Sequence, residues 1–138
     1  ELLITMIALG ILGGIAAPTL RNATYRADAS KIASDMTAVR SAVFEYREDA
    51  SVLPRTAPWR TIPPDLATYF NNVRFIFKTV DYRLVTTAAQ GRVDFIVRYP
   101  NGSPIGAALR RFRRPGNGSG GVTWSATQTR WRLLEQNQ

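Results

Sequence analysis

The first part of the chain is an uncharged apolar run that constrains the fold more than any other feature. Residues 2–17 include one polar side chain, that of Thr5, and follow an acid, Glu1. As a helix, this run would be about 24 Å long, somewhat shorter than the roughly 20 residues that cross a bilayer. A segment of this composition must be covered by lipid or by other protein.

Residues that disfavour a helix lie in the second half of this run. Gly10, Gly13 and Gly14 fall inside it, and Pro18 follows it. In a helix interior each glycine costs about 1 kcal/mol relative to alanine, and proline costs about 3 kcal/mol. Pro18 also lacks an amide hydrogen and crowds the carbonyl of Gly14. We therefore predict a bend or break between residues 10 and 18.

Two general interpretations of the run each leave something unexplained. A secretory signal peptide would have a basic leader and a small-residue cleavage site, whereas here Pro18 directly follows the small residues. A plain membrane anchor fits the hydropathy, and Gly10 and Gly14 form a small-xxx-small pair for helix packing. An anchor gives no role to Glu1, because a carboxylate beside hydrocarbon is costly unless it is paired.

A third interpretation comes from a family resemblance. The string Glu-Leu-Leu-Ile at residues 1–4, Gly10, and Ala-Ala-Pro-Thr-Leu at residues 16–20 resemble the N-terminus of type IV pilins and type II secretion pseudopilins. The first four residues of the mature family pattern are absent. The resemblance implies a prepilin peptidase that cuts a leader and methylates the new terminus, a pilus assembly machinery, and a helical filament of identical subunits.

The resemblance also implies roles for individual residues. It implies that Glu1 pairs with the terminal amine of a neighbouring copy, and that Gly10, Gly13, Gly14 and Pro18 lie where the helix unwinds in a filament. A carboxylate buried without a partner is strongly unfavourable, so such a pair would penalise a wrong axial register. The precursor would lie in the inner membrane, and the product would be an extracellular pilus or a periplasmic pseudopilus.

Beyond residue 18 the helical pattern becomes amphipathic. Its apolar residues recur at steps of three and four: Ala29, Ile32, Met36, Val39, Val43 and Tyr46. The charged residues fall mostly elsewhere on the helix: Arg26, Lys31, Asp35, Arg40 and Arg47. We predict that this helix lies on a sheet and ends near Asp49, before a proline-rich loop over residues 51–64.

The remaining residues predict a small antiparallel sheet over about residues 73–134. A short helix begins at Pro63 and ends near residues 71–72, and strands are expected at residues 73–77, 82–87, 92–99, 105–112 and 122–134. Gln90-Gly91 and Asn101-Gly102 mark reversals. The predicted fold is α+β and type IV pilin-like, with an apolar helix over residues 1–24 and a globular head over residues 25–138.

Composition argues against catalysis. The chain has no cysteine and no histidine, which removes the commonest thiolate nucleophile, general base and transition-metal ligands. The acids of the head are scattered and show no metal-ligand spacing. Three acids gather at the end of the helix, Glu45, Glu48 and Asp49, where we favour pairing with arginines over a cation site. We therefore predict no enzyme, no catalytic residue, no metal and no cofactor.

Positive charge is concentrated in the second part of the chain. The formal net charge is +8, and most of the cations, arginines above all, lie after residue 50. Arg110, Arg111, Arg113 and Arg114 flank Phe112 on a predicted strand, an arrangement that could hold nucleic acid or an anionic surface. The same residues could instead protect an edge strand or bridge to acids of the next subunit. The glycine-rich residues 115–121 lack the ending of a phosphate-binding loop.

These observations favour a structural subunit resembling a major pilin of an extracellular filament. The alternatives are a type II secretion pseudopilin or a minor pilin, and a membrane-anchored module that binds DNA or another polyanion. Major pseudopilins are known for a calcium site in a C-terminal loop, and the corresponding glycine-rich loop here holds no carboxylate. This departure ranks the pseudopilin below the pilin.

Overall fold

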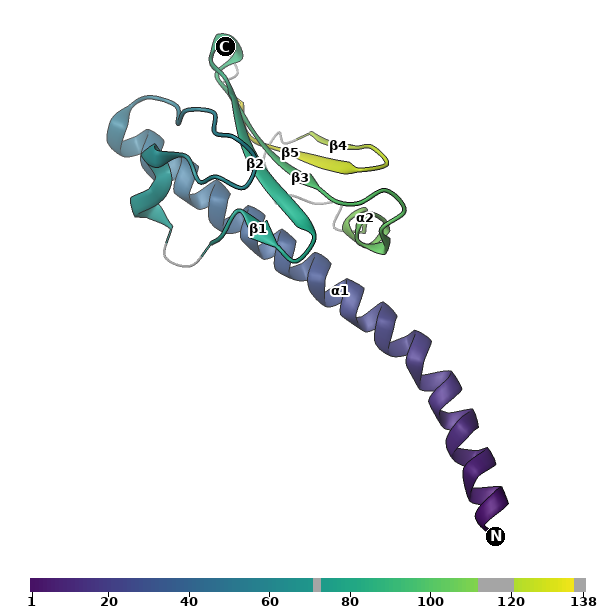
Figure 1. Cartoon of the computed structure of the whole chain (residues 1–138). Helices are drawn as coiled ribbons and strands as arrows, with labels where there is room; N and C mark the ends of the chain where they lie inside the picture. Colours follow the sequence, from purple (N-terminus) through teal and green to yellow (C-terminus); the bar gives the residue numbers. More distant parts are fainter. Residues whose placement is uncertain (71–72, 112–120, 136–138) are drawn as a thin grey trace.

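The computed structural model describes residues 1–70, 73–111 and 121–135, without the side chains of residues 15–19. One long helix, α1 (Leu2–Ala50), forms the spine of the molecule. Its second half lies against a sheet, and its first half extends beyond the head as a gently curved rod (Figure 1). The helix ends at Ser51, which adopts a left-handed conformation with φ 57° and donates its amide to the carbonyl of Arg47.

The helix break predicted between residues 10 and 18 is not present in this single chain, because α1 is helical throughout. Helix propagation is cooperative, so the flanking turns carry a few unfavourable residues, and a proline removes only one backbone hydrogen bond. Unwinding of the same segment inside an assembled filament stays a prediction.

The second half of α1 buries the predicted apolar stripe. Ile32, Val39 and Val43 are fully buried and Met36 is nearly so, while Tyr46 packs against the same core with partial exposure. One assignment on this half of the helix was wrong. Asp35 lies on the buried face with 4% exposure, because its carboxylate has partners in the head that are described below.

The sheet has five strands in the order β1-β2-β3-β5-β4, and every pairing is antiparallel. The strands are β1 (Ile76–Phe77), β2 (Val80–Thr87), β3 (Arg92–Arg98), β4 (Val122–Trp124) and β5 (Gln128–Glu135). The predicted run 122–134 is thus two strands, and the predicted strand 73–77 shortens to its last two residues. The reversal at Gly91 joins β2 to β3, with Gly91 at φ 58°. A long helix packed on an antiparallel sheet confirms the predicted α+β, pilin-like fold.

The strand predicted over residues 105–112 is wrong where the structure describes it. Residues Pro104–Leu109 form a short helix, α2. Ser103 caps it by accepting a hydrogen bond from the amide of Ile105, and Pro104 fits the first turn. The turn at residues 101–102 therefore leads into a helix and not into a hairpin. A second short helix, η1 (Pro64–Tyr69), is where a helix was predicted, but it is a 3-10 helix.

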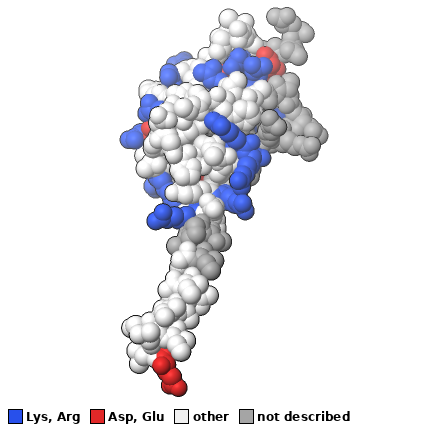
Figure 2. Space-filling model, turned by 90° about the vertical axis from the view of Figure 1, so that its right-hand side faces the viewer, with Lys and Arg blue, Asp and Glu red and all other residues white. Residues whose placement is uncertain are grey.

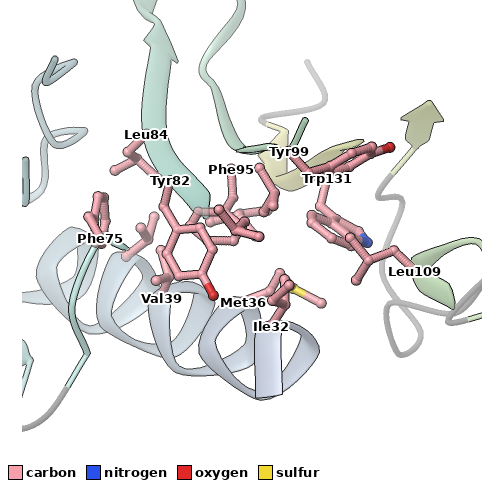
Figure 3. Close-up of a cluster of buried hydrophobic side chains, with 14 of the residues drawn as sticks. Ile32, Met36, Val39, Phe75, Tyr82, Leu84, Phe95, Tyr99, Leu109 and Trp131 are labelled. Carbon is pink, nitrogen blue, oxygen red and sulfur yellow. The ribbon is translucent and has the colours of Figure 1, made fainter. Parts of the chain in front are cut away.

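An aromatic cluster between α1 and the sheet forms the centre of the core (Figure 3). The ring of Phe95 on β3 lies 5.1 Å from that of Tyr82 and 6.2 Å from that of Phe75, in edge-to-face contacts. On the other side it stacks on Trp131 of β5 at 6.1 Å. Side chains from β2, β3 and β5 therefore meet at Phe95, within the cluster that also includes Ile32, Met36 and Val39 of α1.

Gly106 allows α2 to approach the sheet closely. A Cβ atom at this position would lie 2.6 Å from the ring of Tyr99. Tyr99 is nearly buried and its hydroxyl lies 3.2 Å from that of Thr129, so the ring has little freedom to move. We expect Gly106→Ala to lower the free energy of unfolding by about 1 to 3 kcal/mol, the usual cost of overpacking. Chemical denaturation should show a lower midpoint for this variant than for the parent. The matched control is Ala107→Ser, on the exposed side of α2. Equal midpoints for the two variants would contradict this packing.

Candidate functional site

The rod, residues 1–20 of α1, is the most unusual surface of the molecule. The large apolar side chains that the structure describes on it are exposed, from 55% for Ile7 to 77% for Leu2. Figure 2 shows a rod without basic residues, with an acid at its tip, below a head that carries many of them. Among the described residues, no helix combines the length and the hydropathy needed to cross a membrane. The rod therefore presents a long apolar surface that nothing within the described chain covers.

The tip of the rod carries Glu1. Its carbonyl accepts hydrogen bonds from the amide of Thr5 at 3.1 Å and from the hydroxyl of Thr5 at 3.0 Å. Its side chain makes no capping hydrogen bond, and no ion pair links it to another described residue. The carboxylate is therefore available to a group from outside the chain.

The three glycines of the rod have no packing role toward the described residues. A Cβ atom added at Gly10, Gly13 or Gly14 would meet nothing within 4 Å. These glycines therefore affect either the stability of the helix or its contact with another molecule. The side chain of Pro18, the fourth residue predicted for this segment, lies outside the described residues.

Two buried acids hold the head on α1. The carboxylate of Asp35 accepts a hydrogen bond from the hydroxyl of Tyr82 at 2.9 Å and pairs with Lys31. Lys78, in the turn between β1 and β2, forms an ion pair with Asp28 at 2.7 Å. Burial raises the pKa of the Tyr82 hydroxyl, and the negative charge of Asp35 raises it further. These contacts fix the position of the head along the helix, and therefore relative to the rod.

Sequence reasoning missed this pair of acids, although a signal was available. Asp28 and Asp35 are seven residues apart, so they lie on the same face of the helix as the buried Ile32. A charged residue inside an apolar stripe indicates a partner on the element that covers it, because a buried charge must be paired. That partner could not be named without the sheet.

Among the described residues, the acids at the end of α1 do not form the predicted pairs with arginines. Asp49 accepts a hydrogen bond from the hydroxyl of Tyr69 at 2.8 Å, which raises the pKa of that hydroxyl. No ion pair with another described residue is found for Glu45 or Glu48. Among the described residues, no group of acids is arranged to hold a metal ion.

The predicted basic strand is only partly within the described residues. Arg110 and Arg111 lie in the turn after α2, where Arg110 donates its amide to the carbonyl of Gly106. Both are exposed, and Arg111 lines a cavity of about 180 Å³ with Arg26 between α1 and α2. Arg113 and Arg114 lie outside the described residues. The alternation of faces expected of a strand therefore does not apply to Arg110 and Arg111, and their role in anion binding stays a prediction.

Arginines gather instead on the outer face of the sheet, where the sequence had suggested only scattered acids. Asp81 of β2 pairs with Arg60 at 2.6 Å and with Arg98 at 2.8 Å. Asp94 of β3 pairs with Arg92 at 2.6 Å. The alternation Arg-Val-Asp-Phe-Ile-Val-Arg over residues 92–98 already indicated a polar face, but the partner strands were needed to bring these charges together.

Asp81 should make the head sensitive to acid. Burial alone would raise the pKa of this carboxyl, but hydrogen bonds from Arg98 and Arg60 outweigh burial and hold the pKa below its ordinary value. A carboxylate whose pKa is lower in the folded state adds stability above the unfolded pKa of about 3.9. That contribution is lost as the pH falls through the folded pKa. We expect Asp81→Asn to show a smaller drop in melting temperature between about pH 6 and pH 3 than the parent chain, and equal drops would contradict the assignment.

No family model matches the chain, and no solved structure matches it significantly. Three curated proteins are related to it. It is 27% identical to the type II secretion system core protein G of Klebsiella michiganensis, over 75% of this chain and 82% of the relative. The proteins of the same name from Dickeya chrysanthemi and Escherichia coli are 27% and 28% identical, over 75% and 74% of this chain and 76% and 79% of the relatives.

The similarity extends well beyond the rod, because an alignment over three quarters of the chain must include most of the head. It agrees with the N-terminal motif of an acid, an apolar run, glycine and proline. It also agrees with the long helix packed on an antiparallel sheet. These three observations together support the resemblance of the chain to type IV pilins and type II secretion pseudopilins.

Proposed function

We propose that this chain is a structural subunit of a pseudopilus, the helical filament of a type II secretion system, and that it has no enzymatic role. The single observation that carries the proposal is the exposed rod with one acid at its tip. Soluble monomers rarely expose an apolar surface of this extent. Rods of further copies would cover it with the same apolar chemistry, and a terminal amine among them would neutralise Glu1.

The relatives support the pseudopilin over the major pilin that the sequence ranked first. All three carry the name of a type II secretion system protein. The ranking depended on a missing carboxylate in the glycine-rich residues 115–121, nearly all of which lie outside the described residues. An extracellular pilus and a minor pilin therefore become the alternatives to this proposal.

In this proposal the rod holds the precursor at the inner membrane until the subunit enters a periplasmic filament. A prepilin peptidase and the assembly machinery of the secretion system act on it before that step. The contacts of Asp28 and Asp35 with the head then have a mechanical role, because they keep the head at one height on α1. A fixed head position is what a helical assembly of identical subunits requires.

The test is a count of filaments in a host that has both a type II secretion system and type IV pili. The chain is overproduced in the parent host, in a strain without the secretion assembly ATPase, and in a strain without the pilus assembly ATPase. We expect immunogold-labelled filaments in the first and third strains and none in the second. Loss of filaments only in the third strain would identify a pilus subunit. Labelled cells without filaments in any strain would support the membrane-anchored module.

A further inference from the structure

The outer face of the sheet is turned away from α1 and carries six arginines. Val93, Phe95 and Val97 of β3 point into the core, so Arg92, Asp94, Ile96 and Arg98 point outward. The neighbouring strands and the loop before η1 add further cations. We call this surface the arginine face: Arg60, Arg83, Arg92, Arg98, Arg130 and Arg132.

Buried carboxylates form ion pairs with several of these arginines. The side chains of Asp81 and Asp94 are only 9% and 2% exposed, whereas those of Arg60, Arg98 and Arg130 are 60%, 43% and 44% exposed. Two arginines lie around each of the two aspartates, and Arg132 pairs with Glu135. Six cations thus face three anions, so the surface keeps a net positive charge while its two aspartates are largely hidden from solvent.

Packing holds the guanidinium groups in position. Ile96 points outward yet is only 4% exposed. The strand register places Arg83 on one side of it and Arg130 on the other. Arg83 also donates its Nε hydrogen to the carbonyl of Ala57 at 3.2 Å. The ring of Trp59 lies 4.3 Å from the guanidinium carbon of Arg98 and 5.8 Å from that of Arg83. Side chains that are already ordered lose less entropy when they bind a ligand.

The geometry suits an extended chain of phosphates. One group of arginines surrounds Asp81, beside Arg98, and the other surrounds Asp94. Positions 98 and 94 are four residues apart on β3, so the two groups are separated by about 13 Å along the strand. Arg83 and Arg130 lie between them, about 10 Å apart across three strands. Guanidinium groups bind phosphate oxygens in a planar, two-pronged manner that lysine cannot reproduce. We propose that the arginine face binds the phosphodiester backbone of nucleic acid, without reading its sequence.

A bilayer surface fits this face less well. The sheet packs against the side of α1 (Figure 1), so its outer face looks sideways from the rod and not toward its tip. If the chain forms the proposed filament through its rods, the arginine face repeats on the outside at regular intervals. A long polyanion would then contact several copies at once and gain avidity. Only this last step depends on the proposed function, and binding by a single chain does not.

The decisive variant is Arg83→Gln with Arg130→Gln. It leaves both aspartates paired, because Asp81 keeps its two arginines and Arg92 stays 2.6 Å from Asp94. The matched control, Arg21→Gln with Arg47→Gln, removes the same charge from two positions on α1, which packs on the opposite side of the sheet. Arg110→Gln with Arg111→Gln tests the basic cluster predicted from the sequence. A fourth variant, with lysine at positions 83 and 130, keeps the charge but loses the planar fork.

The full chain, dispersed in a mild detergent, is titrated with a fluorescent DNA duplex at several salt concentrations, and the anisotropy gives the dissociation constant. We expect salt-sensitive binding by the parent chain. We expect Arg83→Gln with Arg130→Gln to weaken binding about tenfold and to reduce the slope against log salt by about 1.8, since each lost phosphate contact contributes about 0.9. The lysine variant should fall between these two proteins. The matched control should weaken binding by less than about threefold, through net charge alone.

Three results would overturn the proposal: no binding at about 50 mM salt, equal losses in the decisive variant and its control, or a larger loss in the Arg110 and Arg111 variant. Phosphatidylglycerol vesicles are titrated in parallel, and tighter binding to them that depends on Arg83 and Arg130 would assign the face to lipid instead. Thermal melting of each variant checks that it folds. Filament counts are made separately, so a failure of assembly leaves the binding result intact.

Discussion

Filaments are expected to decrease about tenfold or more in number when Glu1 is replaced by glutamine. A tenfold change corresponds to about 1.4 kcal/mol, which is well within the stabilisation that a desolvated ion pair loses when one charge is removed. No described residue caps or pairs with the Glu1 carboxylate, so we expect its partner to come from another molecule. The measurement is a count of filaments by negative stain at equal amounts of the protein.

The matched control is Glu48→Gln, which removes the same charge from the other end of α1, where no ion pair with a described residue is found. This variant should assemble like the parent. Cell fractionation separates two causes of a low count, because a Glu1 variant that reaches the membrane normally but does not polymerise fails at assembly. Equal filament numbers for the Glu1 variant and the parent would contradict the role of the acid.

The largest loss of stability is expected for Phe95→Ala. The ring is fully buried and contacts Phe75, Tyr82 and Trp131, so its removal leaves a cavity where helix and sheet meet. Large-to-small substitutions of this kind cost about 3 to 5 kcal/mol. The whole free energy of unfolding of a domain of this size is about 5 to 15 kcal/mol. Chemical denaturation followed by circular dichroism should therefore show a much lower midpoint for the variant. If the free energy of unfolding of the parent is near the lower end of this range, part of the variant population should be unfolded at 25 °C without denaturant.

Ile76→Ala provides the comparison for this experiment. Ile76 lies in the edge strand β1 and is 42% exposed, so little buried surface is lost. The substitution should lower the free energy of unfolding by less than about 1 kcal/mol. If the two substitutions cost the same, the aromatic cluster would not be the centre of the core.

Part of the candidate site follows from local sequence alone. The rod, its acid and its glycines were predictable because an uninterrupted apolar run with a charge at one end needs no tertiary context to be recognised. The arginine face was not, although each of its residues was visible. Arg83, Arg98 and Arg130 come from three separate strands, and only strand pairing brings them to one surface. The resemblance pointed to the family, but it ranked the pilin above the pseudopilin on one loop without a carboxylate, whereas the relatives favour the pseudopilin.

The sequence by itself determined α1 and its buried stripe, since the spacing of Ile32, Met36 and Val39 is a property of neighbouring residues in one helix. It also determined most of the sheet, because alternation along β2 and β3 is equally local. Residues 104–109 form a helix and not a strand, for which Ser103 and Pro104 were local signals, but only the tertiary structure decided that Gly106 must fit against Tyr99. It also decided that Asp35 is buried, because a charge enters a core only when a partner such as Tyr82, distant in sequence, is there to receive it.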